Sequence, residues 1–102
     1  MRQLTTPEQF QELLASKTAF IVWFSAAWCS PCQKMDKPRL EEASTEFPLY
    51  YCDEVVNSAS SERAGINQFP TFVFYANGSE VARRMIADTT KVCQWIKKQR
   101  TQ

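Results

Sequence analysis

Hydrophobic residues recur along the first part of the chain at a spacing typical of a helix. Apolar side chains run at this spacing from Phe10 to Leu14, and Thr6 with Gln9 three positions later forms a capping-box pattern ahead of them. A helix is therefore predicted there, and residues 2–4 before it are expected to form a short edge strand.

An uninterrupted apolar run over residues 19–25 predicts a central strand that is covered on both faces of its sheet. The next helix is expected to begin at the pair Cys29 and Cys32 and to continue to about Phe47. Pro38 falls inside this helix and predicts a bend, because an internal proline removes one backbone hydrogen bond.

Turn and capping residues organise the second half of the chain. Asn77-Gly78 is a strong hairpin signal, and Gly65 is expected to end a short helix. Asp88 and Thr89 are placed to cap the last helix. The elements predicted here are strands at 49–52, 72–75 and 80–85, a short helix after the polar segment 53–61, and a last helix that buries Val92, Cys93 and Ile96.

The predicted order is β-α-β-α-β-α-β-β-α. The early crossovers give parallel strand pairs and the hairpin gives an antiparallel one, so the sheet is mixed, with helices on both faces. The chain has 102 residues and contains no repeat, linker or low-complexity tract. We therefore expect one α/β domain over residues 1–102, with about five strands and about four helices.

The charge balance argues against several classes of partner. The net charge is +1, whereas binding to nucleic acid or to a membrane surface calls for a basic patch. The basic residues near the end of the chain, Lys97, Lys98 and Arg100, are explained as the last turn of a helix, where they complement its dipole. With no signal-peptide pattern and no apolar stretch of membrane-spanning length, we expect a cytoplasmic monomer.

The most informative chemical signal is the C-x-x-C of Cys29 and Cys32, at the junction between a predicted strand and a predicted helix. Unpaired N–H groups and the helix dipole should lower the pKa of Cys29 there and make it a nucleophile. Cys32 lies one turn on, within reach of a disulfide, so the pair predicts a reversible dithiol/disulfide couple. A zinc site would need two more ligands, yet the chain has no histidine and no second C-x-x-C. No metal or other cofactor is expected.

Two further cysteines and two acidic residues have simpler explanations. Cys52 on a strand and Cys93 on the apolar face of a helix are predicted to be buried and unreactive. If exposed, either would instead be a point of glutathionylation or dimerisation. Asp53 and Glu54 begin a loop and are expected to form a solvated turn.

Four segments together resemble the thioredoxin family over nearly the whole chain. They are Trp28-Cys29-Ser30-Pro31-Cys32, Pro38, Gly65-Ile66-Asn67-Gln68-Phe69-Pro70-Thr71 and Asn77-Gly78. The resemblance implies the thioredoxin fold and reduction of protein disulfides, with Cys29 as the attacking thiolate and Cys32 as the resolving thiol. It also implies a peptide-binding surface made of Trp28, Ser30, Pro31, Phe69, a cis Pro70, Ile86 and Ala87.

The sequence departs from the family beneath the two cysteines. Family members usually carry a buried aspartate and a lysine partner, but Trp23 and Tyr51 stand at these positions, as in divergent protozoan members. Because the usual base is absent, we hypothesise that Cys32 loses its proton to water or through the Tyr51 hydroxyl. Resolution of the mixed disulfide is then expected to be slower than in other family members, or shifted to higher pH. The alternative is that Trp23 simply fills the core. Ile86 replaces a glycine and is expected to narrow the peptide-binding groove.

The resemblance also implies partners. Expected substrates are disulfide-containing proteins such as ribonucleotide reductase, peroxiredoxin and methionine sulfoxide reductase. An NADPH-dependent thioredoxin reductase, a low-molecular-weight dithiol or a glutaredoxin system would return the electrons, in keeping with a role in electron transport and redox homeostasis. Two other functions stay open, an oxidant or isomerase of the secretory pathway and a non-enzymatic binding module. Pro31, where such isomerases often carry histidine, disfavours the first, and the intact cysteines disfavour the second.

Overall fold

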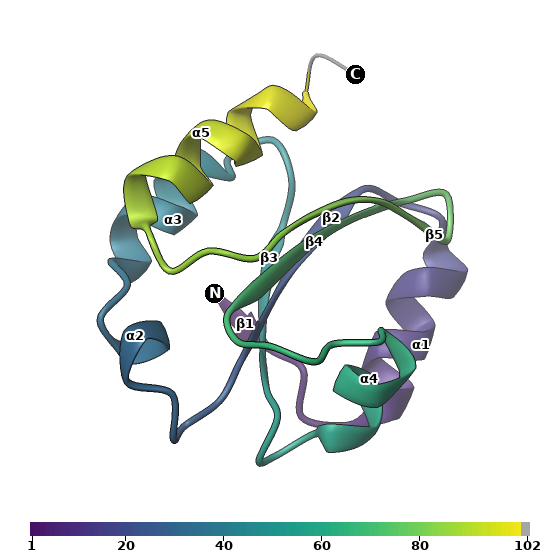
Figure 1. Cartoon of the computed structure of the whole chain (residues 1–102). Helices are drawn as coiled ribbons and strands as arrows, with labels where there is room; N and C mark the ends of the chain where they lie inside the picture. Colours follow the sequence, from purple (N-terminus) through teal and green to yellow (C-terminus); the bar gives the residue numbers. More distant parts are fainter. Residues whose placement is uncertain (101–102) are drawn as a thin grey trace.

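The computed structural model describes residues 1–100 of the chain, which form a central sheet with helices on both sides (Figure 1). Helices α1 and α4 lie on one side of the sheet, and α3 and α5 lie on the other. Within the described residues, none of the helices has the length and apolar character needed to cross a membrane. The elements are β1 (Arg2–Gln3), α1 (Pro7–Ser16), β2 (Phe20–Ser25), α2 (Ser30–Gln33), α3 (Lys37–Ala43), β3 (Leu49–Asp53), α4 (Ser58–Arg63), β4 (Thr71–Ala76), β5 (Ser79–Arg84) and α5 (Thr89–Gln99).

The sheet has five strands in the order β1-β3-β2-β4-β5, which confirms the predicted mixed topology. Strand β3 runs parallel to β1 and to β2, whereas β4 runs antiparallel to β2 and to β5. All six residues of β2 are buried, as its uninterrupted apolar run predicts. The segment that follows β2 therefore leaves the sheet from its centre, where ligands commonly bind in open α/β folds.

Alternation along β2 divides the core into two layers. Ile21 and Trp23 belong to the layer packed against α3 and α5, where Val92 and Ile96 are buried as predicted. Phe20, Val22 and Phe24 belong to the layer on the opposite face of the sheet, together with Phe10 of α1 and Cys52 of β3. Trp23 is thus a residue of the α3–α5 layer.

The second helix differs from its prediction. Instead of one bent helix from Cys29 to about Phe47, the chain forms α2 and α3, which brings the number of helices in the described residues to five. Asp36 caps α3, its carboxylate accepting a hydrogen bond from the Arg39 N–H at 3.2 Å. Pro38 consequently lies in the first turn of a new helix, where its missing N–H has no intrahelical partner to lose.

The short helix α4 begins earlier than predicted. Asn57 caps it by accepting a hydrogen bond from the Ser60 N–H at 3.3 Å, so the helix occupies part of the segment 53–61 that was expected to precede it. The C-cap residue is Ala64, and Gly65 follows it with a φ of 70°. A positive φ suits glycine, which explains why a helix ends at this point.

Three other local predictions are confirmed. The Thr6 side chain accepts a hydrogen bond from the Gln9 N–H while the Gln9 side chain accepts one from the Thr6 N–H, completing the capping box. Asp88 caps α5. Asn77 and Gly78 join β4 to β5 with φ values of 56° and 80°, the positive pair that a tight hairpin turn requires.

Candidate active site

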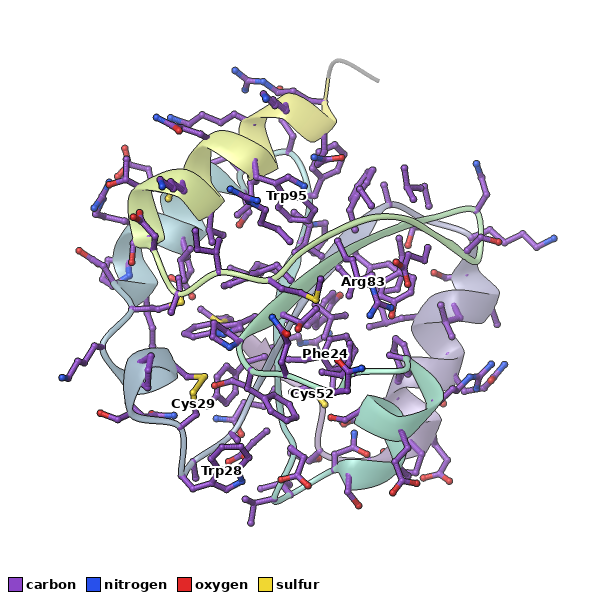
Figure 2. The ribbon with its side chains drawn as sticks, in the orientation of Figure 1. Phe24, Trp28, Cys29, Cys52, Arg83 and Trp95 are labelled. Atoms are coloured by element: carbon purple, nitrogen blue, oxygen red, sulfur yellow. A yellow bond between two sulfur atoms is a disulfide. The ribbon has the colours of Figure 1, made fainter. Side chains whose placement is uncertain are left out.

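The two cysteines of the C-x-x-C lie where β2 gives way to α2. Cys29 is the N-cap residue of α2 and Cys32 lies within the helix. A disulfide joins them, with their Cα atoms 5.3 Å apart (Figure 2). The Cys29 N–H donates to the carbonyl oxygen of Ala26 at 3.0 Å, so the turn after β2 holds the first cysteine in place. The predicted disulfide-forming pair is therefore present.

The two sulfur atoms have different surroundings. The Cys29 side chain is 5% exposed, whereas Cys32 is completely buried. The Cys32 N–H donates a hydrogen bond to the Cys29 Sγ at 3.3 Å, and this sulfur also lies 3.7 Å from the carbonyl oxygen of Phe69. An N–H at the start of a helix stabilises negative charge on the atom that it faces. After reduction, Cys29 is therefore the better placed of the two to carry a thiolate.

Residues implied by the family resemblance surround the disulfide. Phe69 packs against Ala26, Cys29 and Cys32, and its ring meets the Trp28 ring edge-on at 5.6 Å. The Phe69–Pro70 peptide bond is cis. Trp28 is 65% exposed, which leaves its indole open to a partner beside the disulfide. Ser30 and Pro31 are also exposed, in the first turn of α2.

The remaining residues of the expected peptide-binding surface lie in the segment that follows β5. Met85 and Ala87 are exposed, and Ile86 between them is half-buried. Ile86 packs against the core layer that contains Trp23. The narrowing of the groove by Ile86 therefore stays a prediction.

An aromatic stack occupies the positions where the family usually has a charged pair. Trp23 is completely buried, lies parallel to Phe72 with ring centroids 5.5 Å apart, and meets the edge of Tyr51 at 5.0 Å. Its indole N–H has no hydrogen-bond partner among residues 1–100. Lys37 places its ammonium 5.4 Å from the centre of the Tyr51 ring. These contacts fit a core role for Trp23, and proton transfer through Tyr51 stays a prediction.

Asp53 and Glu54 begin a half-exposed turn, as expected, and they also anchor the active-site loop. The Asp53 carboxylate accepts hydrogen bonds from the N–H groups of Ala27 at 3.1 Å and Val55 at 3.0 Å. The Glu54 carboxylate accepts one from the Trp28 indole N–H at 3.2 Å. The carboxyl ends of parallel strands meet at one edge of a sheet. The position of Asp53 at the end of β3 could therefore have indicated that its carboxylate lies near the loop that follows β2.

The other cysteines are buried free thiols, as predicted. Burial raises the pKa of Cys52 to about 11, and a hydrogen bond with Ser61 offsets part of this shift. Burial also raises the pKa of Cys93, whose sulfur lies 3.5 Å from the carbonyl oxygen of Arg39. No group of three or more potential metal ligands (His, Cys, Asp or Glu) occurs within residues 1–100.

A disulfide that closes a C-x-x-C between the central strand of a mixed α/β sheet and the helix that follows it defines a thiol-disulfide oxidoreductase of thioredoxin fold. The family model described as Thioredoxin matches residues 2–98. The chain therefore belongs to the thioredoxin family, and Cys29–Cys32 is its redox-active disulfide. Membership indicates disulfide-containing protein substrates and a reductant that regenerates the dithiol.

Known relatives agree with this assignment. The solved structure of thioredoxin from Plasmodium falciparum has a TM-score of 0.87 to this chain at 31% identity, covering 96% of this chain and 98% of that one. Thioredoxin-1 of Saccharomyces cerevisiae is 30% identical over 97 residues, covering 92% of this chain and 93% of the yeast protein. Protein disulfide-isomerase A5 of Mus musculus is 30% identical over 99 residues, but the match spans only 19% of the mouse protein.

Proposed function

We propose that this protein reduces disulfide bonds in other proteins, with Cys29 as the attacking cysteine and Cys32 as the resolving one. The observation that carries the proposal is the asymmetry of the pair: Cys29 keeps an exposed fraction of 5% and its sulfur accepts a hydrogen bond from a helix-start N–H, whereas Cys32 has no solvent exposure. A thiolate is the nucleophile in disulfide exchange, so this asymmetry determines which sulfur a substrate meets first.

The reaction proceeds in two exchanges. In the reduced protein, the Cys29 thiolate attacks one sulfur of the substrate disulfide, forms a mixed disulfide and releases the other substrate sulfur as a thiolate. Cys32 then loses its proton and attacks the Cys29 sulfur, which closes the Cys29–Cys32 disulfide and releases the second substrate thiolate. Two electrons have passed to the substrate, and an external dithiol must return two electrons to the protein.

The surface around Cys29 suits an extended polypeptide. Trp28 is an exposed aromatic contact, and the Phe69 carbonyl oxygen beside the Cys29 sulfur is a backbone group that a substrate strand could pair with after reduction. Ser30, Pro31, Pro70, Ile86 and Ala87 complete the proposed substrate-binding surface. An alanine substitution of Trp28 tests it and should raise the KM for protein disulfides more than it lowers kcat.

The proton of Cys32 is the second element of the proposal. We assign its removal to water or to the Tyr51 hydroxyl, because the neutral Trp23–Tyr51 stack offers no carboxylate. Tyr51→Phe keeps the ring and removes only the hydroxyl. If the hydroxyl takes part, this variant slows the decay of the mixed disulfide in stopped-flow measurements. An unchanged decay at every pH assigns the step to water.

The proposed setting is the cytoplasm, where the protein would act as a monomer in electron transport. Its proposed substrates are ribonucleotide reductase, peroxiredoxin and methionine sulfoxide reductase. Its proposed reductant is an NADPH-dependent thioredoxin reductase or a low-molecular-weight dithiol. Incubating a Cys32→Ser variant with cytoplasmic extract and identifying the trapped mixed disulfides tests the substrates directly.

An isomerase is the second candidate, since part of a protein disulfide-isomerase is 30% identical to this chain. The reduction potential of the Cys29–Cys32 couple separates the two: thioredoxin-type reductants lie near about −270 mV and protein disulfide isomerase near about −180 mV. Reduction of insulin with dithiothreitol as the electron source gives the activity itself. A protein without this activity, or one whose activity survives Cys29→Ser, would be a binding module instead.

A further inference from the structure

Strand β5 and helix α5 form an open groove whose lining is basic. Its volume is about 560 Å³, and it is lined by Arg83, Arg84, Lys91, Gln94, Trp95 and Lys98. Four of these residues carry positive charge and none carries negative charge. A net charge of +1 does not predict such a surface, because its cations come from two segments of the chain that only the fold brings together.

Helix α5 gives the groove a linear arrangement. Lys91, Trp95 and Lys98 are spaced four and three residues apart, which places them on one face of the helix over about 10 Å. Trp95 is half-buried, lies on the sheet side of α5 and packs against the core beneath it (Figure 2). The groove therefore has an aromatic centre with cations on either side.

Not every cation of the lining is available to a ligand. The Arg83 guanidinium is held by both carboxylate oxygens of Glu80, at 2.8 and 2.6 Å, and by the Ala64 carbonyl oxygen at 2.8 Å. Arg84 and Lys91 are both exposed, and neither side chain forms an ion pair within residues 1–100. The argument rests on these last two residues.

The chain connects the lining of the groove directly to the proposed substrate surface. Arg84 is the last residue of β5, and residues 85–87, which the family resemblance assigns to the peptide-binding surface, follow it directly. At the other end of this connection, Thr89 of α5 accepts a hydrogen bond from the Asp36 N–H at 3.1 Å, just beyond α2. A polypeptide held at Cys29 could thus extend along α5 without crossing the sheet.

We propose that this groove binds an acidic segment of the protein partner whose disulfide is reduced at Cys29. The inference rests on the proposed reductase function and adds a basis for choosing among substrates. Arg84 on β5 and Lys91 on α5 are exposed cations from two elements, and they can contact successive acidic side chains of an extended chain, which advances about 3.3 Å per residue. A phosphate group would call for donors that converge on one point. Complementary charge accelerates the encounter between the protein and an acidic substrate. Once the acidic segment is bound in the groove, the substrate disulfide is held near Cys29 at a high effective concentration.

The test uses two synthetic peptides that share one intramolecular disulfide. One carries a tail of four Asp or Glu residues, and the other a tail of equal length made of Ser and Gln. The wild-type protein, kept reduced by dithiothreitol, should reduce the acidic peptide with a kcat/KM about tenfold higher at low salt, mainly through KM. About 0.5 M salt should remove the difference.

Two charge-reversal variants locate the effect. Arg84→Glu/Lys91→Glu should abolish the preference for the acidic peptide while leaving reduction of the neutral peptide within about twofold. The matched control, Arg2→Glu/Lys17→Glu, makes the same change in net charge on β1, at the opposite edge of the sheet from β5, and at the end of α1, and should keep most of the preference. Equal loss in both variants would show that net charge, and not this groove, makes the selection, and would overturn the proposal.

The remaining outcomes separate docking from catalysis. A wild-type protein that reduces both peptides equally at low salt overturns the docking site and leaves the reductase function intact. A protein that reduces neither peptide overturns the proposed function itself. If tripolyphosphate at matched ionic strength protects the tryptophan fluorescence of the wild type, but not that of Arg84→Glu/Lys91→Glu, from quenching by acrylamide, and the acidic peptide gives no such protection, the groove is a phosphate site and the peptide proposal is wrong.

Discussion

Cys32 and Cys52 are both completely buried, yet only Cys32 belongs to the redox pair. Cys52 lies within β3 in the core layer on the α1 side, on the other side of the sheet from the disulfide (Figure 2). Cys32 lies one turn into α2, behind Cys29. Burial is therefore the same at the two positions, and what distinguishes Cys32 is its disulfide partner, Cys29, three residues before it.

The comparison identifies the difficult step of the proposed reaction. Burial raises the pKa of Cys52 to about 11 because a thiolate there would lose its hydration. Cys32 is completely buried as well, so forming its thiolate after reduction also means placing a charge away from water. The neutral stack of Trp23 and Tyr51 provides no charge to relieve it. Attack by Cys29 should consequently be fast and resolution by Cys32 slow.

The largest expected effect is on Cys29. Cys29→Ser removes the nucleophile and should lower the rate of protein-disulfide reduction by about 10⁴-fold or more. Cys32→Ser should still make the first attack and accumulate the mixed disulfide on a non-reducing gel. Cys52→Ala should reduce insulin within about twofold of the wild-type rate. Loss of activity in Cys52→Ala, in a protein that remains folded, would end the distinction between the two buried thiols.

The next effect concerns the stack beside the redox pair. Trp23→Asp replaces a completely buried indole with a smaller carboxylate that has no partner, and should lower the free energy of unfolding by about 3–5 kcal/mol. Trp23→Asp/Tyr51→Lys supplies a partner and should recover part of this loss. Urea unfolding of the three proteins measures both changes.

The same variants test the slow step. If the missing carboxylate limits resolution, the double variant should move the mixed-disulfide decay in single-turnover experiments to lower pH. Identical pH profiles in the double variant and the wild type would mean that the missing charges do not control Cys32, and that Trp23 matters only as core.

The strands, helix caps and turns of this fold also show what the sequence can predict. The apolar run of β2, the caps at Thr6 and Asp88 and the Asn77-Gly78 turn are local signals, and the structure confirms them. The C-x-x-C at a strand-to-helix junction likewise locates the redox pair without tertiary information. The division of the second helix was missed although Asp36 with Pro38 two residues later is itself a local helix start.

Features that depend on strand register or on packing could not be read from the chain. Asp53 reaches Ala27 because the parallel register places Asp53 opposite Ser25 at the end of β2. The basic groove exists because the packing of α5 against β5 places Arg84 and Lys91 along one groove. Strand register and helix packing decide these two arrangements, and no residue involved is unusual at its own position.

A smaller effect appears in the pH dependence of stability, measured in a Cys29→Ser/Cys32→Ser background where no disulfide can exchange. Cys52 has a pKa of about 11 in the folded protein against 9.0 for an ordinary thiol. Between these values the unfolded chain has lost a proton that the folded protein retains. Stability should therefore fall as the pH rises from about 9 to about 11, by roughly 2–3 kcal/mol at most.

Cys52→Ala in the same background isolates this contribution. It should flatten the decline between pH 8 and pH 10.5 in urea unfolding, leaving the parts due to Cys93 and Tyr75, whose pKa values burial also raises. All three groups act in the same direction, because each stays neutral to higher pH in the folded protein than in the unfolded chain. A decline as steep in Cys52→Ala as in its parent would mean that the pKa of Cys52 is the same in the folded and the unfolded chain, and that burial at this position does not penalise a thiolate.

The smallest effect tests the connection between the two regions, since Asp53 follows Cys52 on β3 and holds Ala27 in the loop before Cys29. Asp53→Ala leaves two N–H groups without their acceptor and should lower stability by about 1–2 kcal/mol and raise the KM for a protein disulfide a few-fold. Asp53→Asn keeps an acceptor oxygen and should fall nearer the wild type. If both variants lose the same amount of stability, the charge of the Asp53 carboxylate and not its hydrogen-bond geometry joins β3 to the active-site loop.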